Sequence, residues 1–305
     1  MIMDEENTRL YLIIPCYNEE AIINITADRV NTKFNELIQN GLISMDSRIV
    51  FVDDGSMDNT WGLIQQYCYS SSRYIGVKLS RNFGQQNALL AGMEYARGKC
   101  DCIISIDADL QDDINVLSEF IEKYRHGHEI VYGVRDDRST DSMFKRYSAS
   151  LFYKIMKMID SSVIENHSEC RLLGSKALEA LSQCKEYSVF LRGIIPRLGF
   201  NSEKVYYSRQ KRIAGETKYS VWKLIKLALE GIILSDAKLN RYIHVMTLAC
   251  LIFGLFNVRF NPWIGLAIQL SCLSIFSGYV AKIYTETKQR PRYIIDCIAE
   301  NKRCS

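Results

Sequence analysis

The sequence predicts an α/β fold over residues 1–219, followed by a pair of apolar helices. Short apolar runs alternate with longer amphipathic stretches from the start of the chain, which is the pattern of a parallel sheet with helices on both faces. The 305 residues are 48% hydrophobic and 24% charged, a globular balance that excludes a disordered chain, collagen and a coiled-coil rod. Near the end of the chain, two apolar runs with few charges replace the alternation.

Five apolar runs predict strands, and the four stretches between them have helical spacing. The expected strands are 11–15, 48–53, 74–79, 102–107 and 130–134. The expected helices are 20–38, 59–69, 85–97 and 115–126. Ligands of such sheets bind beyond the carboxyl ends of the strands, so the residues that follow each strand are the place to look for a site.

After residue 140 the spacing becomes mainly helical, apart from a strand-like stretch at 203–208 and a basic loop at 209–218. Residues 221–234 combine Trp222 with a dense apolar set and interleaved lysines. This pattern predicts an interfacial helix that lies on a membrane. An ordinary amphipathic helix packed on the domain is the alternative.

The apolar runs at 242–256 and 263–280 predict a membrane hairpin. A spanning helix needs about 20 residues, so the first run is short and the second is adequate. Basic residues precede and follow the pair, whereas Arg259 is the one basic residue between them, so both ends are expected in the cytoplasm. A soluble helical pair is the alternative.

The net charge of +3 is too small to indicate nucleic acid as a partner. The ten cysteines are scattered without a second pair at zinc spacing, which predicts buried thiols in a reducing compartment. Residues 1–9 are acidic and lack the apolar core of a secretory signal.

Four polar clusters stand at successive strand ends. They are Pro15-Cys16-Tyr17-Asn18-Glu19-Glu20, Val52-Asp53-Asp54-Gly55-Ser56, Ser80-Arg81-Asn82-Phe83-Gly84 and Asp107-Ala108-Asp109-Leu110-Gln111. Each cluster alone is typical of turns and helix caps. Their joint occurrence at one edge of a sheet indicates a binding site.

The carboxylates of Asp107 and Asp109 are hard oxygen ligands suited to Mg²⁺ or Mn²⁺ bridging a diphosphate. Such a metal would neutralise a departing nucleotide. The carboxylate of Asp53 could accept hydrogen bonds from a base or a ribose. The candidate phosphate donors are Arg81, Arg135, Arg209, Arg212 and Lys218.

The ordered motifs resemble the glycosyltransferase family 2 enzymes that make polyprenyl-phosphate sugars, such as bactoprenol glucosyltransferases and dolichol-phosphate mannosyltransferases. The resemblance runs from Leu12 to Ile295 and includes, besides the four clusters, Phe190-Leu191-Arg192-Gly193, Arg212-Ile213-Ala214-Gly215-Glu216-Thr217-Lys218-Tyr219 and Arg290-Pro291-Arg292-Tyr293.

This resemblance implies a GT-A fold, a UDP- or GDP-sugar donor, a divalent metal (Mg²⁺ or Mn²⁺) and an inverting transfer to a lipid phosphate. It implies that Asp107, Asp109 and Gln111 hold the metal. The implied nucleotide-sugar set is Pro15, Tyr17, Glu19, Asp53, Arg81, Asp107, Ala108, Gln111 and Arg135. The implied catalytic set is Asp109, Glu169, Arg212 and Lys218.

Two positions depart from the family pattern. Asp112-Asp113-Ile114 stands where relatives have Asp-Pro-Pro, which is expected to alter only the entry to the next helix. Glu169 stands where they have aspartate, and Arg171 is its expected ion-pair partner. Glu169 could act as a base, or it could orient the acceptor or Arg171. Because a lipid phosphate is already an anion, it needs a cationic cradle more than a base.

The predicted organisation is a GT-A catalytic domain at 1–219, an interfacial helix at 220–238, a two-helix membrane hairpin at 239–284 and a cytoplasmic tail at 285–305. The predicted activity is transfer of a hexose, glucose from UDP-glucose, to undecaprenyl phosphate at the cytoplasmic face of the membrane, with membrane lipid as a partner. The resemblance also suggests a homo-oligomer. The alternatives are elongation of a saccharide, which needs a clear general base, and a nucleotide-sugar-binding subunit without turnover.

Overall fold

The computed structural model describes residues 7–135, 167–187, 189–208, 248 and 262–301. Its strands are β1 (Leu10–Cys16), β2 (Arg48–Asp53), β3 (Tyr74–Leu79), β4 (Cys102–Ser105), β5 (Ile130–Arg135), β6 (His167–Gly174), β7 (Ser202–Tyr207) and β8 (Ile295–Glu300). Its helices are α1 (Ile23–Gln39), α2 (Thr60–Ser70), α3 (Gln85–Ala96), α4 (Val116–Arg125), α6 (Ser175–Gln183), α7 (Leu191–Arg197) and α10 (Pro262–Thr287).

Within these described residues the strands form one mixed sheet in the order β7-β5-β6-β4-β1-β2-β3-β8. Strands β1 to β4 are parallel, as the alternating sequence predicts, and β5 is parallel to β7. The two exceptions are β6, antiparallel to both β4 and β5, and β8, antiparallel to β3. The carboxyl ends of β1 to β4 therefore meet at one edge, where the four polar clusters follow.

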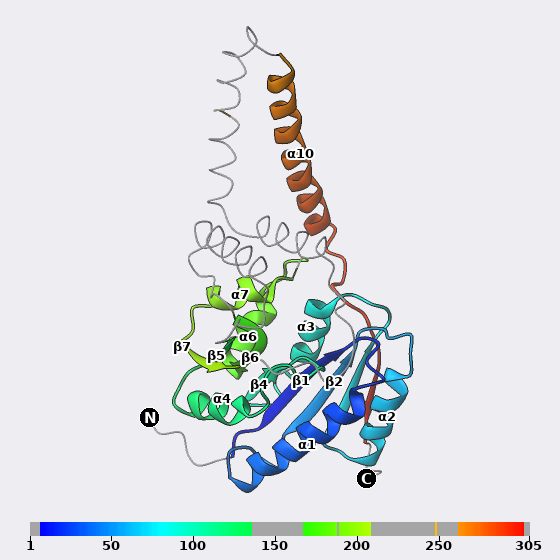
Figure 1. Ribbon diagram of the computed structural model, residues 1–305, viewed down its shortest axis with the longest axis vertical. Helices are drawn as coiled ribbons and strands as arrows, with labels where there is room; N and C mark the ends of the chain where they lie inside the picture. Colours follow the sequence, from blue (N-terminus) through cyan, green and yellow to red (C-terminus); the bar gives the residue numbers. More distant parts are fainter. Residues whose placement is uncertain (1–6, 136–166, 188, 209–247, 249–261, 302–305) are drawn as a thin grey trace.

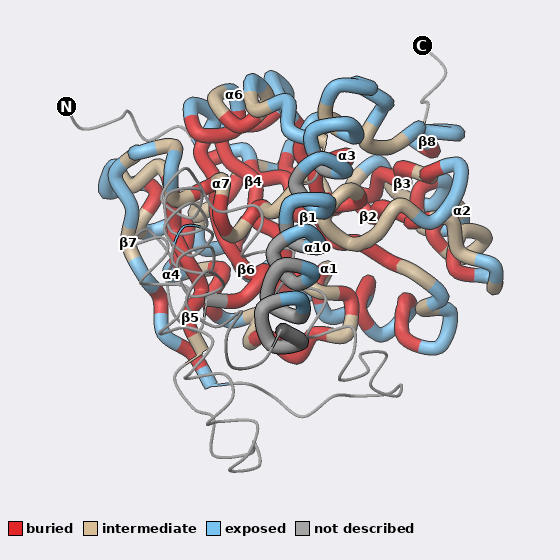
Figure 2. Tube along the Cα trace, turned by 90° about the horizontal axis from the view of Figure 1, so that it is seen from above, coloured by how far each residue is buried: buried red, intermediate tan, exposed pale blue. Residues whose placement is uncertain are grey.

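Helices cover both faces of the sheet, which confirms the predicted layers (Figures 1 and 2). Helices α1, α2 and α4 pack in one apolar cluster, and α3, α6 and α7 pack in the other. Successive strand residues alternate between the two: Leu12 faces the first cluster and Ile13 the second. Helix α1 buries its apolar stripe because Ile23, Ala27 and Val30 recur at helical spacing.

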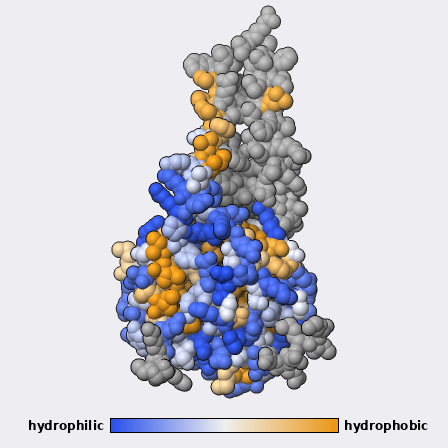
Figure 3. All heavy atoms as spheres, turned by 180° about the vertical axis from the view of Figure 1, so that it is seen from behind, coloured by the Kyte–Doolittle hydropathy of each residue, from blue (hydrophilic) through white to orange (hydrophobic). Residues whose placement is uncertain are grey.

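Helix α10 projects from the sheet domain and contains the second apolar run (Figure 1). Its exposed side chains include Leu266, Leu270, Leu273 and Phe276, and Figure 3 shows apolar side chains on this projection above a hydrophilic zone. None of the helices in the described part of the chain has the combination of length and apolarity needed to cross a membrane. The first run, 242–256, lies outside the described residues except for Leu248, and so does the predicted interfacial helix.

The segment after α10 returns to the sheet, which the sequence analysis did not predict. Ser80 N–H donates to the carbonyl oxygen of Ile294 at 2.9 Å, and β8 then pairs with β3. Lys78 of β3 and Asp296 of β8 form an ion pair at 3.6 Å. The predicted tail at 285–305 therefore contributes an edge strand to the catalytic sheet.

Candidate active site

Hydrogen bonds in both directions join the loop after β1 to the loop after β2. Asn18 N–H donates to Ser56 Oγ at 2.9 Å, and Asn18 Oδ1 accepts from Met57 N–H at 2.8 Å. Glu19 N–H donates to Thr60 Oγ1 at 2.8 Å. The end of β1 and this loop carry three of the residues expected at the nucleoside: Pro15, Tyr17 and Glu19.

Asp53, the last residue of β2, is fully buried. Its Oδ1 accepts from Ser56 N–H at 3.2 Å, whereas its Oδ2 has no hydrogen-bond partner among the described residues. Burial is the main cause that raises the pKa of Asp53, and the bonds to Ser56 oppose this rise. A buried carboxylate oxygen without a donor is suited to a hydroxyl or N–H of a ligand, as expected for a nucleoside.

Asp54 connects the loop after β2 to the loop after β3. Its two carboxylate oxygens accept from the backbone N–H groups of Phe83 at 2.7 Å and Gly84 at 2.9 Å. Burial raises the pKa of Asp54 to about 6 despite these bonds. Gly55 directly follows Asp53 and Asp54 and has a φ of +67°. A Cβ at this position would lie 2.4 Å from the backbone carbonyl carbon of Arg81 in the loop after β3.

The loop after β4 carries the predicted metal ligands. Asp107 Oδ1 accepts from the side-chain amide of Gln85 at 2.7 Å, and Asp109 Oδ1 accepts from Gln111 N–H at 3.3 Å. Ala108 and Gln111 are buried. The turn therefore fixes both carboxylates at the end of a central strand, with Gln85 at the first position of α3 reaching one of them.

Negative charge accumulates around Asp107. Burial raises the pKa of Asp107 to about 7, and the nearby carboxylates of Asp112, Glu169 and Asp109 add to the rise, whereas Arg135 opposes it. The structure thus brings together four predicted site residues from three separate strand ends: Asp107, Asp109, Arg135 and Glu169.

Arg135, at the end of β5, is paired with Asp112. Its Nε and Nη2 both donate to Asp112 Oδ1, at 3.1 and 2.9 Å. Burial alone would lower the pKa of Arg135, but the attraction and hydrogen bonds of Asp112, together with Tyr207 and Asp107, outweigh burial and raise it. The guanidinium is thereby held charged beside the carboxylates of the β4 loop, where a phosphate contact is expected.

Glu169 lies on β6 and is 6% exposed. Its Oε2 accepts from Arg171, the ion pair that the sequence predicts. Its Oε1 accepts from Arg192 Nε of α7 at 2.7 Å and from Gln86 Nε2 of α3 at 3.1 Å. Two guanidinium groups and an amide therefore hold this carboxylate through both of its oxygens.

Arg171 is a fully buried arginine. Burial lowers its pKa, and Glu169 opposes this shift. Its Nε and Nη1 have no hydrogen-bond partner within the described ranges of the chain. A buried guanidinium with N–H donors that lack a partner is suited to bind an anion.

The remaining predicted cations have local or undescribed positions. Arg81 lies over the ring of Phe83, 4.0 Å from its centroid, and donates to the carbonyl oxygen of Asn82 at 3.0 Å. This exposed side chain is turned to its own loop. Arg209, Arg212 and Lys218 lie outside the described residues, so their predicted roles stay predictions.

The residues present fit a divalent cation. Among the described residues, no three His, Cys, Asp or Glu side chains form a group that could hold a metal. Magnesium, however, commonly takes one or two carboxylates and completes its shell with water and substrate phosphates. Asp107 and Asp109 provide two carboxylates, and the charges of Asp112 and Glu169 beside them add to the negative charge that a cation would relieve.

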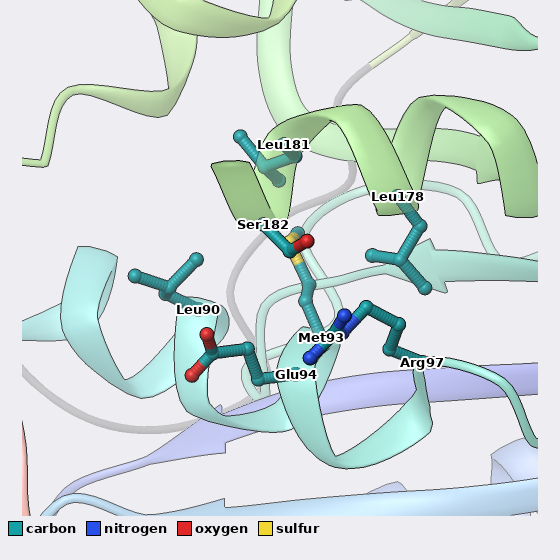
Figure 4. Close-up of a pocket in the computed structure, with 7 residues that line it drawn as sticks. All are labelled: Leu90, Met93, Glu94, Arg97, Leu178, Leu181 and Ser182. Atoms are coloured by element: carbon teal, nitrogen blue, oxygen red, sulfur yellow. The ribbon is translucent and has the colours of Figure 1, made fainter. Parts of the chain in front are cut away.

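A shallow groove elsewhere lies between α3 and α6 (Figure 4). Leu90, Met93 and Glu94 line it from α3, Arg97 lines it from the position just after that helix, and Leu178 lines it from α6. These α3 residues follow Gln85 toward the carboxyl end of the helix, away from the strand ends that carry the polar clusters. The groove is therefore separate from the candidate site.

Sequence reasoning missed three residues of this arrangement. At Gln85 and Gln86 the sequence predicts only the start of a helix, and at Arg192 it shows only a motif residue. Their contacts with Asp107 and Glu169 join residues that are between 22 and 83 positions apart in the sequence. No local sequence pattern can therefore predict these contacts.

Comparisons with known proteins show which family the chain belongs to. The profile of glycosyl transferase family 2 matches residues 11–182. The chain is 38% identical over 322 residues to the uncharacterized glycosyltransferase YkoT of Bacillus subtilis (strain 168), covering 99% of this chain and 96% of the relative. It is 35% identical over 309 residues to the bactoprenol glucosyl transferase of Shigella phage SfV, covering 94% of this chain and 98% of the relative.

The solved structures with distant similarity include the mannosyltransferase of Pyrobaculum calidifontis in complex with GDP-Man and Mn²⁺, with 14% identity, a TM-score of 0.45, and coverage of 93% of this chain and 84% of that one. The family profile spans more than half of the chain and includes all four strand-end clusters. The protein is a glycosyltransferase that belongs to glycosyl transferase family 2.

Proposed function

We propose that this glycosyltransferase transfers glucose from UDP-glucose to undecaprenyl phosphate, with inversion, at the cytoplasmic face of a membrane. Relatives named bactoprenol glucosyl transferase, which match 94% of the chain, support both the sugar and the lipid. The apolar side chains that α10 exposes support a membrane position, because large exposed apolar patches mark contact with lipid or protein.

The observation that carries the choice of acceptor is the environment of Glu169. A general base must receive a proton, but both oxygens of this carboxylate already accept hydrogen bonds. One oxygen accepts from the guanidinium group of Arg171 and the other from that of Arg192. A phosphate monoester has its second pKa at about 6 and is mostly a dianion near pH 7. Such an acceptor needs no base, and the two arginines instead suit its negative charge.

We propose that Asp107 and Asp109 hold Mg²⁺ or Mn²⁺ together with the donor diphosphate, with Gln111 beside them. When bound, the metal would neutralise charge on the departing nucleotide. The residues Pro15, Tyr17, Glu19 and Asp53 would hold the nucleoside, and Arg135, Arg212 and Lys218 would meet phosphates.

The direct test uses the purified full chain with undecaprenyl phosphate and a panel of UDP- and GDP-sugars, and reads the lipid product by mass. The expected product is undecaprenyl-phosphate glucose from UDP-glucose. Transfer to a saccharide but not to the lipid phosphate would favour the elongating alternative. Donor binding without any transfer would favour the non-catalytic subunit.

The metal role predicts that excess chelator abolishes transfer and that added Mg²⁺ or Mn²⁺ restores it. Asp109→Asn removes a charged ligand and is expected to lower turnover by about 10²-fold or more, with little change in the unfolding midpoint. Turnover and thermal unfolding, measured on the same preparation, separate the two effects. Full activity in excess chelator would exclude the metal.

A further inference from the structure

We propose that Gln86 is a positioning residue: its side-chain amide fixes the carboxylate of Glu169 in the orientation that the acceptor side of the site requires. The proposal deepens the proposed function and rests on it. Gln86 does not belong to the nucleotide, metal or phosphate sets, and it lies on the first turn of α3, beside the strand ends that carry the site.

Both ends of the Gln86 amide are used. Its Nε2 donates to Glu169 Oε1 at 3.1 Å, and its Oε1 accepts from Leu191 N–H, the first residue of α7, at 3.1 Å. A carboxylate only accepts and a backbone N–H only donates, so these two partners fix which way the amide points. One side chain thus ties α3 to both β6 and α7.

The preceding residue, Gln85, holds a carboxylate on the donor side of the site in the same way. Gln85 Nε2 donates to Asp107 Oδ1 at 2.7 Å, while Gln86 holds Glu169. Neighbouring residues of a helix point in directions about 100° apart, so one turn of α3 reaches two different strand ends. The first turn of α3 therefore sets the spacing between the carboxylate expected at the metal and the carboxylate expected at the acceptor.

The contact with Glu169 differs from the contacts of the two arginines. Arg171 and Arg192 supply charge, and both would still attract the carboxylate if Gln86 were removed. Of the three hydrogen bonds to Glu169 described above, the one from Gln86 comes from α3, whereas the two arginines lie on β6 and α7. Without the Gln86 contact, the carboxylate of Glu169 should keep its charged partners but change its position. Small displacements of groups at a reaction site have large effects on rate.

Two substitutions separate orientation of Glu169 from simple attachment of α7. Gln86→Met keeps the length of the side chain and loses both hydrogen bonds. Gln86→Glu keeps an acceptor for Leu191 N–H but places a second carboxylate against Glu169. If Gln86 served only to attach α7, Gln86→Glu would be the milder change; if it orients Glu169, Gln86→Glu is the more harmful one.

The experiment measures steady-state transfer from UDP-glucose to undecaprenyl phosphate by the full-length wild type and both variants at pH 8. Leu178→Ala, in the groove between α3 and α6, serves as a control that lowers stability away from the site (Figure 4). The expected result is a kcat lower by about 10- to 100-fold in Gln86→Met and lower still in Gln86→Glu. The KM for UDP-glucose is expected to stay within about twofold of the wild type, because the two described hydrogen bonds of the Gln86 side chain go to Glu169 and Leu191 and not to the nucleotide-sugar set.

A wild-type kcat in Gln86→Met, or a milder loss in Gln86→Glu than in Gln86→Met, would overturn the positioning role while leaving the proposed function in place. A loss of kcat no larger than that of Leu178→Ala at equal thermal stability would overturn it as well. Failure of the wild type itself to glycosylate undecaprenyl phosphate would instead overturn the proposed function, and this proposal with it.

Discussion

Gly55 lies where the backbone of one site loop approaches the backbone of the next. Its φ of +67° disfavours any residue with a Cβ, and that Cβ would also meet the Arg81 backbone at 2.4 Å. Gly55→Ala is therefore expected to cost at least about 2 kcal/mol of the free energy of unfolding. Gly98→Ala is the matched control, because Gly98 has a φ of +73° with nothing within 4 Å of a Cβ. Denaturant unfolding should show the smaller loss in Gly98→Ala, and equal losses would contradict the close approach.

Asp54 makes stability depend on pH. Its pKa in the folded protein is about 6, above the ordinary value of 3.8, so the folded state holds the proton more tightly than the unfolded state does. The stability that this proton contributes is complete below about pH 4 and is lost as the pH rises through 6. Relative to Asp54→Asn, which cannot ionise, the wild type should lose on the order of 1–3 kcal/mol between pH 4.5 and 7.5.

The comparison uses urea unfolding of both proteins in matched buffers at several pH values. Subtracting the variant removes the contributions of the other titrating groups. A difference that stays constant with pH would show that the two N–H bonds from Phe83 and Gly84 outweigh burial.

At this scale the sequence predicts residues whose chemistry is visible in a short motif. Asp107, Asp109 and the Glu169–Arg171 pair are of this kind, because each is defined by a spacing of two residues. The partners of Asp54 and Glu169 are not visible in a motif, because Phe83 reaches Asp54 from the loop before α3 and Gln86 reaches Glu169 from the first turn of α3. Tertiary geometry alone supplies those contacts.

The secondary-structure elements also divide into those that the sequence predicts and those that it does not. The strands β1 to β5 were predicted because they are apolar runs with helical stretches between them. Strand β6 was missed because Ser168, Glu169 and Arg171 interrupt its apolar pattern, although all three are buried and hydrogen-bonded. A buried polar network is indistinguishable from a loop in the sequence.

Strand β8 was missed for a different reason. It is an edge strand, and most of its residues are exposed, so it lacks the apolar run of a central strand. Ala299, which is 6% exposed, packs in the apolar cluster under α1 and α2, whereas Ile298 is 45% exposed.

This contrast gives a test of β8. Ala299→Asp places a charge in the apolar cluster and is expected to cost at least about 2 kcal/mol of unfolding free energy. Ile298→Asp, at the neighbouring position of the same strand, should change it by less than about 1 kcal/mol. Thermal or denaturant unfolding of the two variants gives the comparison, and similar losses would show that β8 does not pair with β3 as described.

On the scale of the whole molecule, α10 and the segment after it are bound to the catalytic domain at several points. Tyr187 N–H donates to Glu286 Oε2 at 2.7 Å, and Arg292 donates to the carbonyl oxygen of Cys184. Both contacts hold the connection between α6 and α7, and α7 carries the arginine that contacts Glu169. The base of α10 is thus linked to the acceptor side of the site.

The proposed membrane position predicts that the full-length chain sediments with membranes and stays there in high salt, which screens ionic attachment but not apolar contact. The intact chain is the right sample, because a chain cut before α10 would also lose β8. Fractionation followed by immunoblotting gives the measurement. Recovery of the intact chain in the soluble fraction without detergent would rule out the membrane position.

Strand β8 also has a consequence for how the protein is made. Chains emerge from the ribosome amino end first, so β1 to β7 and their helices are available before α10, and β8 comes after it. Until then the edge of β3 is an open template for pairing with other chains. A nascent chain would therefore have a sheet that lacks its edge strand β8 until α10 has been synthesised and positioned. The newly made protein is most prone to misassembly during that interval.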